Sequence, residues 1–167
     1  MSSESSSRPE TPVTATEFRQ ACGRFATGIT IASVLDETGT PHGLTVNSFS
    51  SVSLDPPLVL VCLGHVVTAI EIFRAARHFG LNVLAANQRE LSQRFATKDC
   101  DKFDGLSWHR GTTGVPLLPH TLAEIECAVE RIVPAGDHDI FIAEMVHVRL
   151  HEGEPLIYFG GRYRELG

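Results

Sequence analysis

The stretch LAEIECAVERIV, residues 122–133, carries one of the two longest strand signals in the chain. Apolar and acidic side chains alternate along it, with Glu124, Glu126 and Glu130 at even-numbered positions. Alternation with a period of two is typical of a β-strand that has one face in the core. The stretch therefore predicts a long strand with one dry face and one acidic face in water. The second signal, IFIAEMVHVRLHEG at residues 140–153, also alternates and follows the turn formers PAGDHD.

Outward from this pair, further strand signals are separated by turns or short helical stretches. Residues 28–35 alternate, and the turn formers DETGTP after them predict a hairpin whose second arm runs through residues 44–52. The runs PLVLVCLG at 57–64 and HFGLNVLAA at 78–86 are almost entirely apolar, which predicts strands buried on both faces. A last apolar run, PLIYFG, occupies residues 155–160.

Three stretches have helical character. Thr14 and Glu17 have the spacing of a capping box, and apolar residues recur at helical intervals after them, so we expect a short helix that ends near Gly28. Helices are also expected over residues 66–77 and over residues 87–97, where Asn87 is suited to cap the second.

These patterns predict a mainly β domain with short α insertions over residues 14–167. Roughly six or seven strands joined mostly by short turns favour an antiparallel barrel or sandwich over a doubly wound parallel sheet. Residues 98–119 have no clear period and are expected to be mostly loop. Residues 1–13 are mainly Ser, Glu, Pro and Thr, which predicts a disordered N-terminal tail.

Composition narrows the class of function. Lys and Arg number 14 against 20 Asp and Glu, a net charge of −6, which argues against non-specific binding of nucleic acid or of a membrane surface. The four cysteines form no CxxC pair and have no zinc-site spacing with the histidines, so no metal is expected. The polar start of the chain has no apolar signal region, and the working location is the cytoplasm.

Three polar stretches are candidates for a site, and each also has a purely structural interpretation. LTVNSFSSVSLDPP at 44–57 places hydroxyl groups between apolar runs, where they either bind a polar ligand or bond to local backbone. AGDHDIF at 135–141 is first of all a typical hairpin turn, and its functional interpretation is a histidine and a carboxylate that face a cleft. YFGGRYREL at 158–166 has glycines, arginines and tyrosines suited to a ligand or to a solvated C-terminal strand.

In their order along the chain, these stretches resemble the short-chain flavin reductase family, the small reductase components of two-component flavin-dependent monooxygenases. The resemblance runs from about residue 16 to residue 164 and also includes FRQACGRFATGITIAS, NVLAANQRELSQRFA and KFDGLSW. It implies a split β-barrel that works as a homodimer, with the flavin near the subunit interface.

The resemblance also implies a set of site residues. His138 is associated with the nicotinamide, together with Gly136 and Asp137 of the same motif. In the family, a serine often precedes the helix threonine, whereas this chain has Val67, which cannot donate to a phosphate. The expected flavin contacts, with the C-terminal residues that close over the cofactors, are Thr45, Val46, Asn47, Ser48, Ser51, Val52, Ser53, Thr68, Ala85, Gln88, Phe95, Tyr158, Arg162 and Tyr163.

The implied activity is NAD(P)H:flavin oxidoreduction, with FMN or FAD as the flavin and NADH or NADPH as the reductant. The reduced flavin would diffuse to a partner oxygenase. Two alternatives remain open: a non-catalytic flavin- or haem-binding split-barrel protein, and an FMN-dependent oxidase of the pyridoxamine-phosphate oxidase type.

Overall fold

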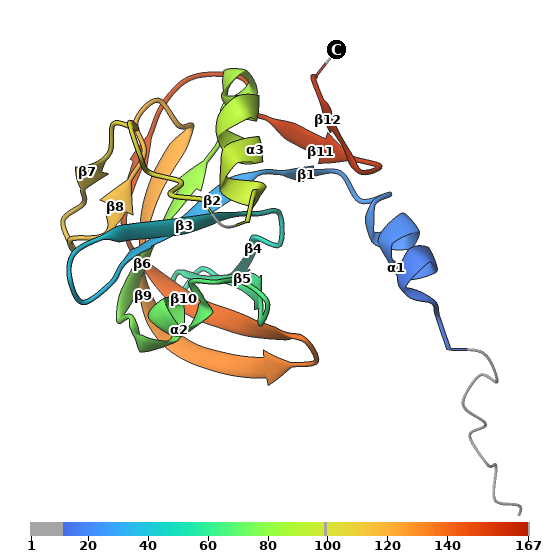
Figure 1. The fold of residues 1–167 in the computed structure, drawn as a ribbon, viewed down its shortest axis with the longest axis horizontal. Helices are drawn as coiled ribbons and strands as arrows, with labels where there is room; N and C mark the ends of the chain where they lie inside the picture. The colour runs from blue at the N-terminus through green and yellow to red at the C-terminus, as the bar shows by residue number, and fades with distance from the viewer. Residues whose placement is uncertain (1–11, 99, 167) are drawn as a thin grey trace, which may run out of the picture.

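The computed structural model describes residues 12–98 and 100–166 (Figure 1). The tail predicted over residues 1–13 therefore lies outside the described residues except for Pro12 and Val13. The elements in chain order are α1 (Ala15–Cys22), β1 (Thr27–Gly28), β2 (Thr30–Leu35), β3 (Pro41–Val46), β4 (Ser50–Ser53), β5 (Leu58–Gly64), α2 (Ile70–Ala75), β6 (His78–Val83), the 3₁₀ turn η1 (Ala86–Gln88), α3 (Arg89–Ala96), β7 (His109–Arg110), β8 (Pro116–Leu117), β9 (Ala123–Ala135), β10 (His138–Leu150), β11 (Ile157–Phe159) and β12 (Arg162–Arg164).

Seven strands form one antiparallel sheet in the order β3-β2-β6-β9-β10-β5-β4. The sheet curls around a core, as the ribbon shows (Figure 1). At the open side, Ser48 links the end of β3 to β5: its Oγ donates to the carbonyl of Cys62 at 3.1 Å and accepts the Cys62 N–H at 2.9 Å. The predicted mainly β, antiparallel architecture is confirmed, and so is a hairpin of β2 and β3. The predicted second arm over residues 44–52 is wrong in its bounds, because β3 covers Pro41–Val46 and Ser50–Ser53 form β4, which pairs with β5.

The core has two parts. Inside the barrel, Phe73, Phe79 and Phe141 pack edge to face, with each pair of ring centroids 6.3 Å apart. Outside the sheet, a second cluster lies beneath α3, where Phe95 and Phe103 pack edge to face at 5.0 Å. The second cluster holds α3 and the C-terminal segment against the barrel wall.

The prediction of an acidic, wet face on β9 is wrong at two of its three positions. Glu124 and Glu126 are only 4% and 5% exposed, because the β7–β8 hairpin covers them. Glu126 accepts the backbone N–H groups of Thr112 and Thr113 at 2.8 and 2.6 Å. Burial raises the pKa of Glu126, but the hydrogen bonds from the Thr113 hydroxyl and from the backbone of Thr113 and Thr112 outweigh burial and lower it overall. Glu130 is exposed, as predicted.

The prediction that β5 is buried on both faces is also wrong. Val59, Val61 and Leu63 are buried, whereas the residues between them are half-buried. The reason is the position of β5 near the end of the sheet, where its second face borders a cavity described below. By contrast, β6 is buried at its four central positions, in agreement with the sequence.

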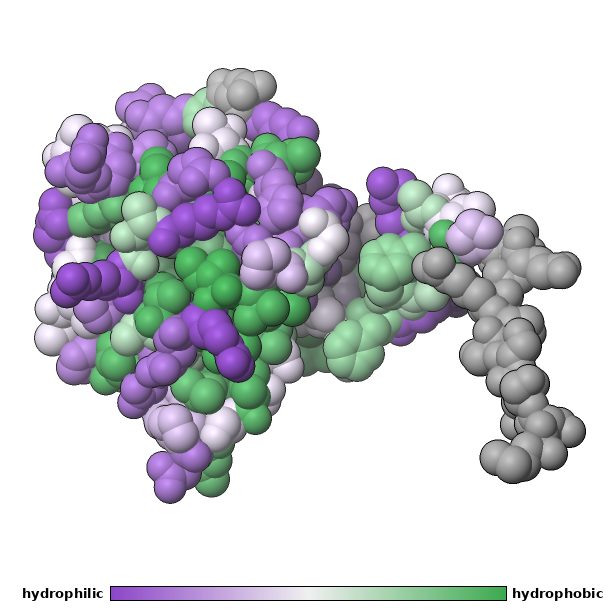
Figure 2. Space-filling view, turned by 90° about the horizontal axis from the view of Figure 1, so that it is seen from below, coloured by the Kyte–Doolittle hydropathy of each residue, from purple (hydrophilic) through white to green (hydrophobic). Residues whose placement is uncertain are grey.

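The capping box of α1 is confirmed, but the helix ends at Cys22 instead of near Gly28. The following residues turn toward the sheet, and Thr27 and Gly28 pair with β11. The helix stands beside the barrel and buries none of its residues (Figures 1 and 2). Phe18 and Phe25 are 61% and 78% exposed.

The predicted cap of the helix after β6 is wrong. Asn87 lies inside the 3₁₀ turn and is exposed, and α3 begins two residues later. The side-chain oxygen of Gln88 instead accepts the Ala85 N–H at 3.0 Å, so the glutamine organises this turn.

The helix predicted over 66–77 is shorter, since α2 covers only Ile70–Ala75. None of the helices in the described ranges is long and apolar enough to cross a membrane.

Candidate active site

A cavity of about 310 Å³ lies between the end of β3, the end of β5 and the β9–β10 turn. We call it the central cavity. The structure thus brings together stretches that are about ninety residues apart in the sequence. Six of the residues predicted for the site line the central cavity: Thr45, Val46, Asn47, Ser48, Asp137 and His138. The remaining lining residues are Leu44, Cys62, Gly64, Val66 and Val67.

The β9–β10 turn presents His138 to this cavity. Gly136 has a φ of 66°, a left-handed conformation that glycine adopts without strain. Oδ1 of Asp137 lies 2.6 Å from Nδ1 of His138, and an ionised carboxylate only accepts, so Nδ1 carries the proton. This hydrogen bond and the nearby imidazole lower the pKa of Asp137. His138 pairs with Gly64 across the β5–β10 ladder.

A second cavity, of about 200 Å³, lies beside the first and shares Thr45 and Asn47 with it. We call it the tyrosine cavity, because Tyr158 and Tyr163 line it from β11 and β12. The Tyr163 hydroxyl lies 3.0 Å from Oγ of Ser92 in α3, which ties the C-terminal hairpin to the helix. The two tyrosine rings pack edge to face at 5.6 Å.

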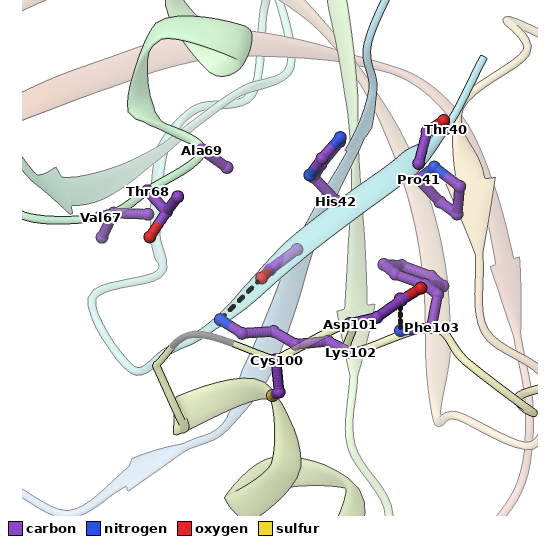
Figure 3. Close-up of a pocket in the computed structure, with 11 residues that line it drawn as sticks. Thr40, Pro41, His42, Val67, Thr68, Ala69, Cys100, Asp101, Lys102 and Phe103 are labelled. Carbon is purple, nitrogen blue, oxygen red and sulfur yellow. Dashed lines mark hydrogen bonds between the residues drawn. The ribbon is translucent and has the colours of Figure 1, made fainter. Parts of the chain in front are cut away.

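A third cavity, of about 430 Å³, lies on the other side of Val67 (Figure 3). We call it the lysine cavity. The first residues of β3 form one side of it, the residues before α2 form another, and residues 100–103 form the third. Thr68 lines it, whereas Val67 lines both this cavity and the central one.

These cavities belong to a chain whose family can be identified by comparison. Residues 22–167 match the family model described as flavin reductase like domain. The chain is a member of the flavin reductase-like family. It is 43% identical over 146 residues to FMN reductase (NADH) SmoA of Agrobacterium fabrum, a match that covers 87% of this chain and 83% of the relative.

Two further relatives resemble this flavin reductase over most of their length. The reductase component of 4-nitrophenol 4-monooxygenase/4-nitrocatechol 2-monooxygenase of Rhodococcus opacus is 38% identical over 152 residues, covering 91% of this chain and 81% of the relative. The solved structure of NADH:FAD oxidoreductase SgcE6 of Streptomyces globisporus C-1027, in complex with NAD and FAD fragments, matches with a TM-score of 0.88 and 35% identity. That match covers 96% of this chain and 98% of the solved one.

Several expected site residues of the reductase lie away from the three cavities. Ser51, Val52 and Ser53 are on the edge strand β4, where Ser51 and Val52 are exposed, and none of the three lines a described cavity. Arg162 is exposed on β12. Their contacts with flavin remain predictions that rest on the family resemblance.

Other residues of the reductase that were expected to contact flavin have structural roles in this fold. Phe95 is fully buried and packs under Gly43, so its ring supports the cavity wall and has no surface for a ligand. Gln88 bonds to Ala85, as described, and its amide nitrogen donates to the carbonyl of Pro119 at 3.2 Å. Ser48 lines the central cavity, but its hydroxyl already bonds to the backbone of Cys62.

Sequence reasoning missed a charged network directly behind the His138 turn. Asp139 is 2% exposed, and its carboxylate accepts His65 Nε2 at 3.1 Å and Arg74 Nε at 2.7 Å. Burial raises the pKa of Asp139, yet these two donors outweigh burial and lower it. The backbone N–H of His65 also donates to the Asp137 carbonyl at 2.9 Å. The signal for this network in the sequence was weak, because Asp139 looked like one more turn former.

The lining of the central cavity fits a flavin ring. An isoalloxazine is flat and apolar over its dimethylbenzene part and polar over its pyrimidine part. The cavity offers both, since Leu44, Val46 and Val66 are apolar while Thr45 and Asn47 carry hydroxyl and amide groups. His138 lines the same cavity from β10, where its imidazole can contact a second planar ligand.

Proposed function

We propose that the central cavity holds the flavin ring and a nicotinamide next to each other, and that the chain reduces FMN or FAD with NADH or NADPH. The chain is a flavin reductase by its family and by its named relatives. One observation carries the assignment of the site: the Asp137–His138 pair and the Thr45–Ser48 segment line one cavity.

A flavin held in this cavity would supply the hydride acceptor, its N5 atom, for the hydride on C4 of the nicotinamide. The chain's own contribution is positioning. Asp137 holds the proton on Nδ1 of His138, which leaves Nε2 to bond to the nicotinamide amide or its linker. Thr45 Oγ1 donates to the carbonyl of Ser92 at 2.6 Å. This hydrogen bond holds α3 against β3 beside the proposed position of the flavin ring. A misplacement of about 1 Å between reacting groups can cost roughly a hundredfold in rate.

A single assay tests this function. Purified protein is mixed with NADH and FMN or FAD in air, and the loss of NADH absorbance is followed. NADH loss that requires both the protein and added flavin supports the reductase. Flavin binding without NADH loss would favour the carrier instead. Oxygen consumption that requires a small amine, in a mixture without NADH, would favour the oxidase.

We further propose that reduced flavin leaves the chain for a separate oxygenase. The relative from Rhodococcus opacus is named as a reductase component of a monooxygenase. All three cavities are open at the surface of the described chain, which is consistent with a flavin that is exchanged and not permanently held. Addition of a flavin-dependent oxygenase would then consume the reduced flavin without a stable complex between the two proteins.

A homodimer is the proposed assembly, and we propose the cytoplasm as its location. The apolar side chains of Phe18 and Phe25 on and after α1 are exposed in the single chain, as are Val148 and Leu150 at the end of β10. We propose that a second copy of the chain covers these side chains, because a dimer would remove their apolar surface from water. Analytical ultracentrifugation tests the dimer: Phe18→Ser together with Phe25→Ser is expected to shift the protein toward monomer.

A further inference from the structure

His65 lies immediately after β5, next to the turn that carries His138, and the proposed hydride transfer does not use it. Its neighbours in the sequence, Gly64 and Val66, line the central cavity, whereas His65 does not. Because His65 is outside this lining, any contribution that it makes to the reaction acts through another residue.

The backbone at the end of β5 supports the His138 turn directly. The N–H of His65 donates to the carbonyl of Asp137 at 2.9 Å, and Gly64 is the ladder partner of His138. The His138 imidazole lies over Gly64, because a Cβ built there would be 3.4 Å from Nε2 and 3.7 Å from each of the two ring carbons bonded to Nε2. The ring therefore packs on the backbone that leads into His65.

The side chain of His65 holds the other side of the same turn. Its Nε2 lies 3.1 Å from Oδ1 of Asp139, a side chain that is only 3% exposed. An ionised carboxylate only accepts, so Nε2 of His65 carries the proton and donates. Asp139 follows His138 in the chain, just as Asp137 precedes it. His65 thus bonds to both sequence neighbours of His138, to one through its backbone and to the other through its side chain.

Asp139 is itself fixed to α2, so the contact with His65 has a rigid base. Nε of Arg74 donates to Oδ2 of Asp139 at 2.7 Å, and Nη2 of Arg74 lies 2.6 Å from the same oxygen. Arg74 therefore occupies Oδ2 and leaves Oδ1 to His65. Hydrogen bonds between charged groups are roughly twice as strong as those between neutral ones, so this carboxylate keeps its orientation.

We propose that His65 is a positioning residue for hydride transfer: it bonds to both neighbours of His138 and so keeps the imidazole over Gly64, in the orientation that contacts the nicotinamide. The inference rests on the proposed function, since it takes His138 to be the nicotinamide contact. The effect of His65 is therefore on the rate of flavin reduction and not on the binding of flavin.

Stopped-flow reduction of bound flavin by saturating NADH tests this role. His65→Leu removes the donor to Asp139 and keeps the backbone N–H, and it is expected to slow flavin reduction roughly tenfold, because small displacements of a positioning group are costly. The affinity for flavin should change by less than about twofold. His65→Gln keeps a side-chain N–H donor and should restore the rate to within about twofold of the parent protein.

His151→Leu is the matched control. The His151 side chain is also 39% exposed, and its Nε2 lies 3.2 Å from Oε1 of Glu124, a carboxylate that is 4% exposed. Both leucine variants therefore remove one histidine donor from a buried carboxylate, but His151 follows the far end of β10. His151→Leu should leave the reduction rate unchanged. Equal losses of rate in the two variants would show a general loss of stability and overturn the proposal.

A double-mutant cycle separates positioning from an independent effect. If His65 acts through His138, then His65→Leu should change the rate by less than about twofold in a His138→Ala background. A tenfold loss in that background as well would overturn the proposal.

The imidazole signals of His138 in long-range ¹H–¹⁵N spectra give a measurement that needs no activity. His65→Leu should shift or broaden these signals, and His151→Leu should not. If the parent protein does not reduce flavin but the signals respond in this way, the positioning by His65 stands while the proposed function fails. If the parent reduces flavin and His65→Leu reduces it equally fast, the proposed function stands and the role of His65 fails.

Discussion

Oδ1 of Asp137 lies 2.6 Å from Nδ1 of His138 at the exposed turn between β9 and β10. This pair sets the direction in which the imidazole presents its other nitrogen. The Nε2 atom faces β5, where a Cβ built on Gly64 would come within 3.4 Å of it. Asp137 thus orients the imidazole of His138, whose side chain is about half exposed.

Replacement of His138 should separate nicotinamide use from flavin binding. His138→Ala is expected to lower kcat/KM for NADH roughly tenfold to a hundredfold, because the nicotinamide loses a positioning contact. Flavin affinity should stay within about twofold, since the ring contacts the β3 side of the cavity. Steady-state kinetics and flavin titration measure the two effects, and His147→Ala on the same strand is the control. Loss of flavin affinity with unchanged turnover at saturating flavin would contradict the assigned role.

Ser48 is expected to stabilise the barrel. Ser48→Ala removes both hydrogen bonds to the Cys62 backbone and should lower the free energy of unfolding by about 1–3 kcal/mol. Urea denaturation measures the change, and Ser51→Ala, an exposed serine of β4, should alter stability by less than about 0.5 kcal/mol. Equal stability of the two variants would show that the Ser48 bridge contributes nothing.

The neighbouring serines provide a separate test of the flavin contacts. From the family resemblance, Ser51→Ala together with Ser53→Ala should weaken flavin binding about tenfold, since two hydroxyl donors are lost. Fluorescence titration with FMN and FAD measures the affinity. An unchanged titration would remove β4 from the flavin site and leave Thr45 and Asn47 as its principal polar lining on this side.

The Asp139 network should make stability depend on acid pH. The folded pKa of Asp139 lies below its unfolded value of about 3.9, because hydrogen bonds from His65 and Arg74 outweigh the effect of burial. The stabilisation is therefore complete above the unfolded pKa and is lost as the pH falls through the folded pKa. Asp139→Asn should lower the melting temperature at neutral pH and flatten its decline in acid.

The matched control for this network is Glu71→Gln. Glu71 is the exposed partner of the same arginine, with Nη1 of Arg74 at 2.6 Å from its carboxylate. Exposed ion pairs contribute little, so its melting profile should follow that of the parent protein. A profile for Asp139→Asn that coincides with this control would contradict the prediction.

Gly43 should not tolerate a side chain. A Cβ at this position would lie 2.8 Å from the Phe95 ring and 2.9 Å from the Ala32 carbonyl oxygen. Gly43→Ala is therefore expected to cost about 1–3 kcal/mol through overpacking. Chemical denaturation checks this value, with Gly28→Ala as the control because nothing lies within 4 Å of its Cβ position. Similar free-energy changes at the two glycines would show that the close contact with Phe95 does not set the effect.

Much of the fold could be predicted because its signals are local. The capping box at Thr14 and Glu17 and the turn after β2 depend on residues within a few positions of one another. The stretches that line the central cavity were singled out because their order along the chain resembles a family, and their contacts with flavin stay predictions. Lys102 was missed, since its position between two backbone carbonyls depends on β3 and α3 together.

The sequence by itself determined the long strands, their mostly short turns and the family of this protein, because side-chain periodicity and motif order are properties of the chain alone. Only the tertiary structure decided which polar residues are buried and which border a ligand. Glu124 and Glu126 are covered by a hairpin that has no strong signal of its own, and Ser48 bonds across the barrel opening. Such contacts join residues that lie far apart in the chain, and no local pattern encodes them.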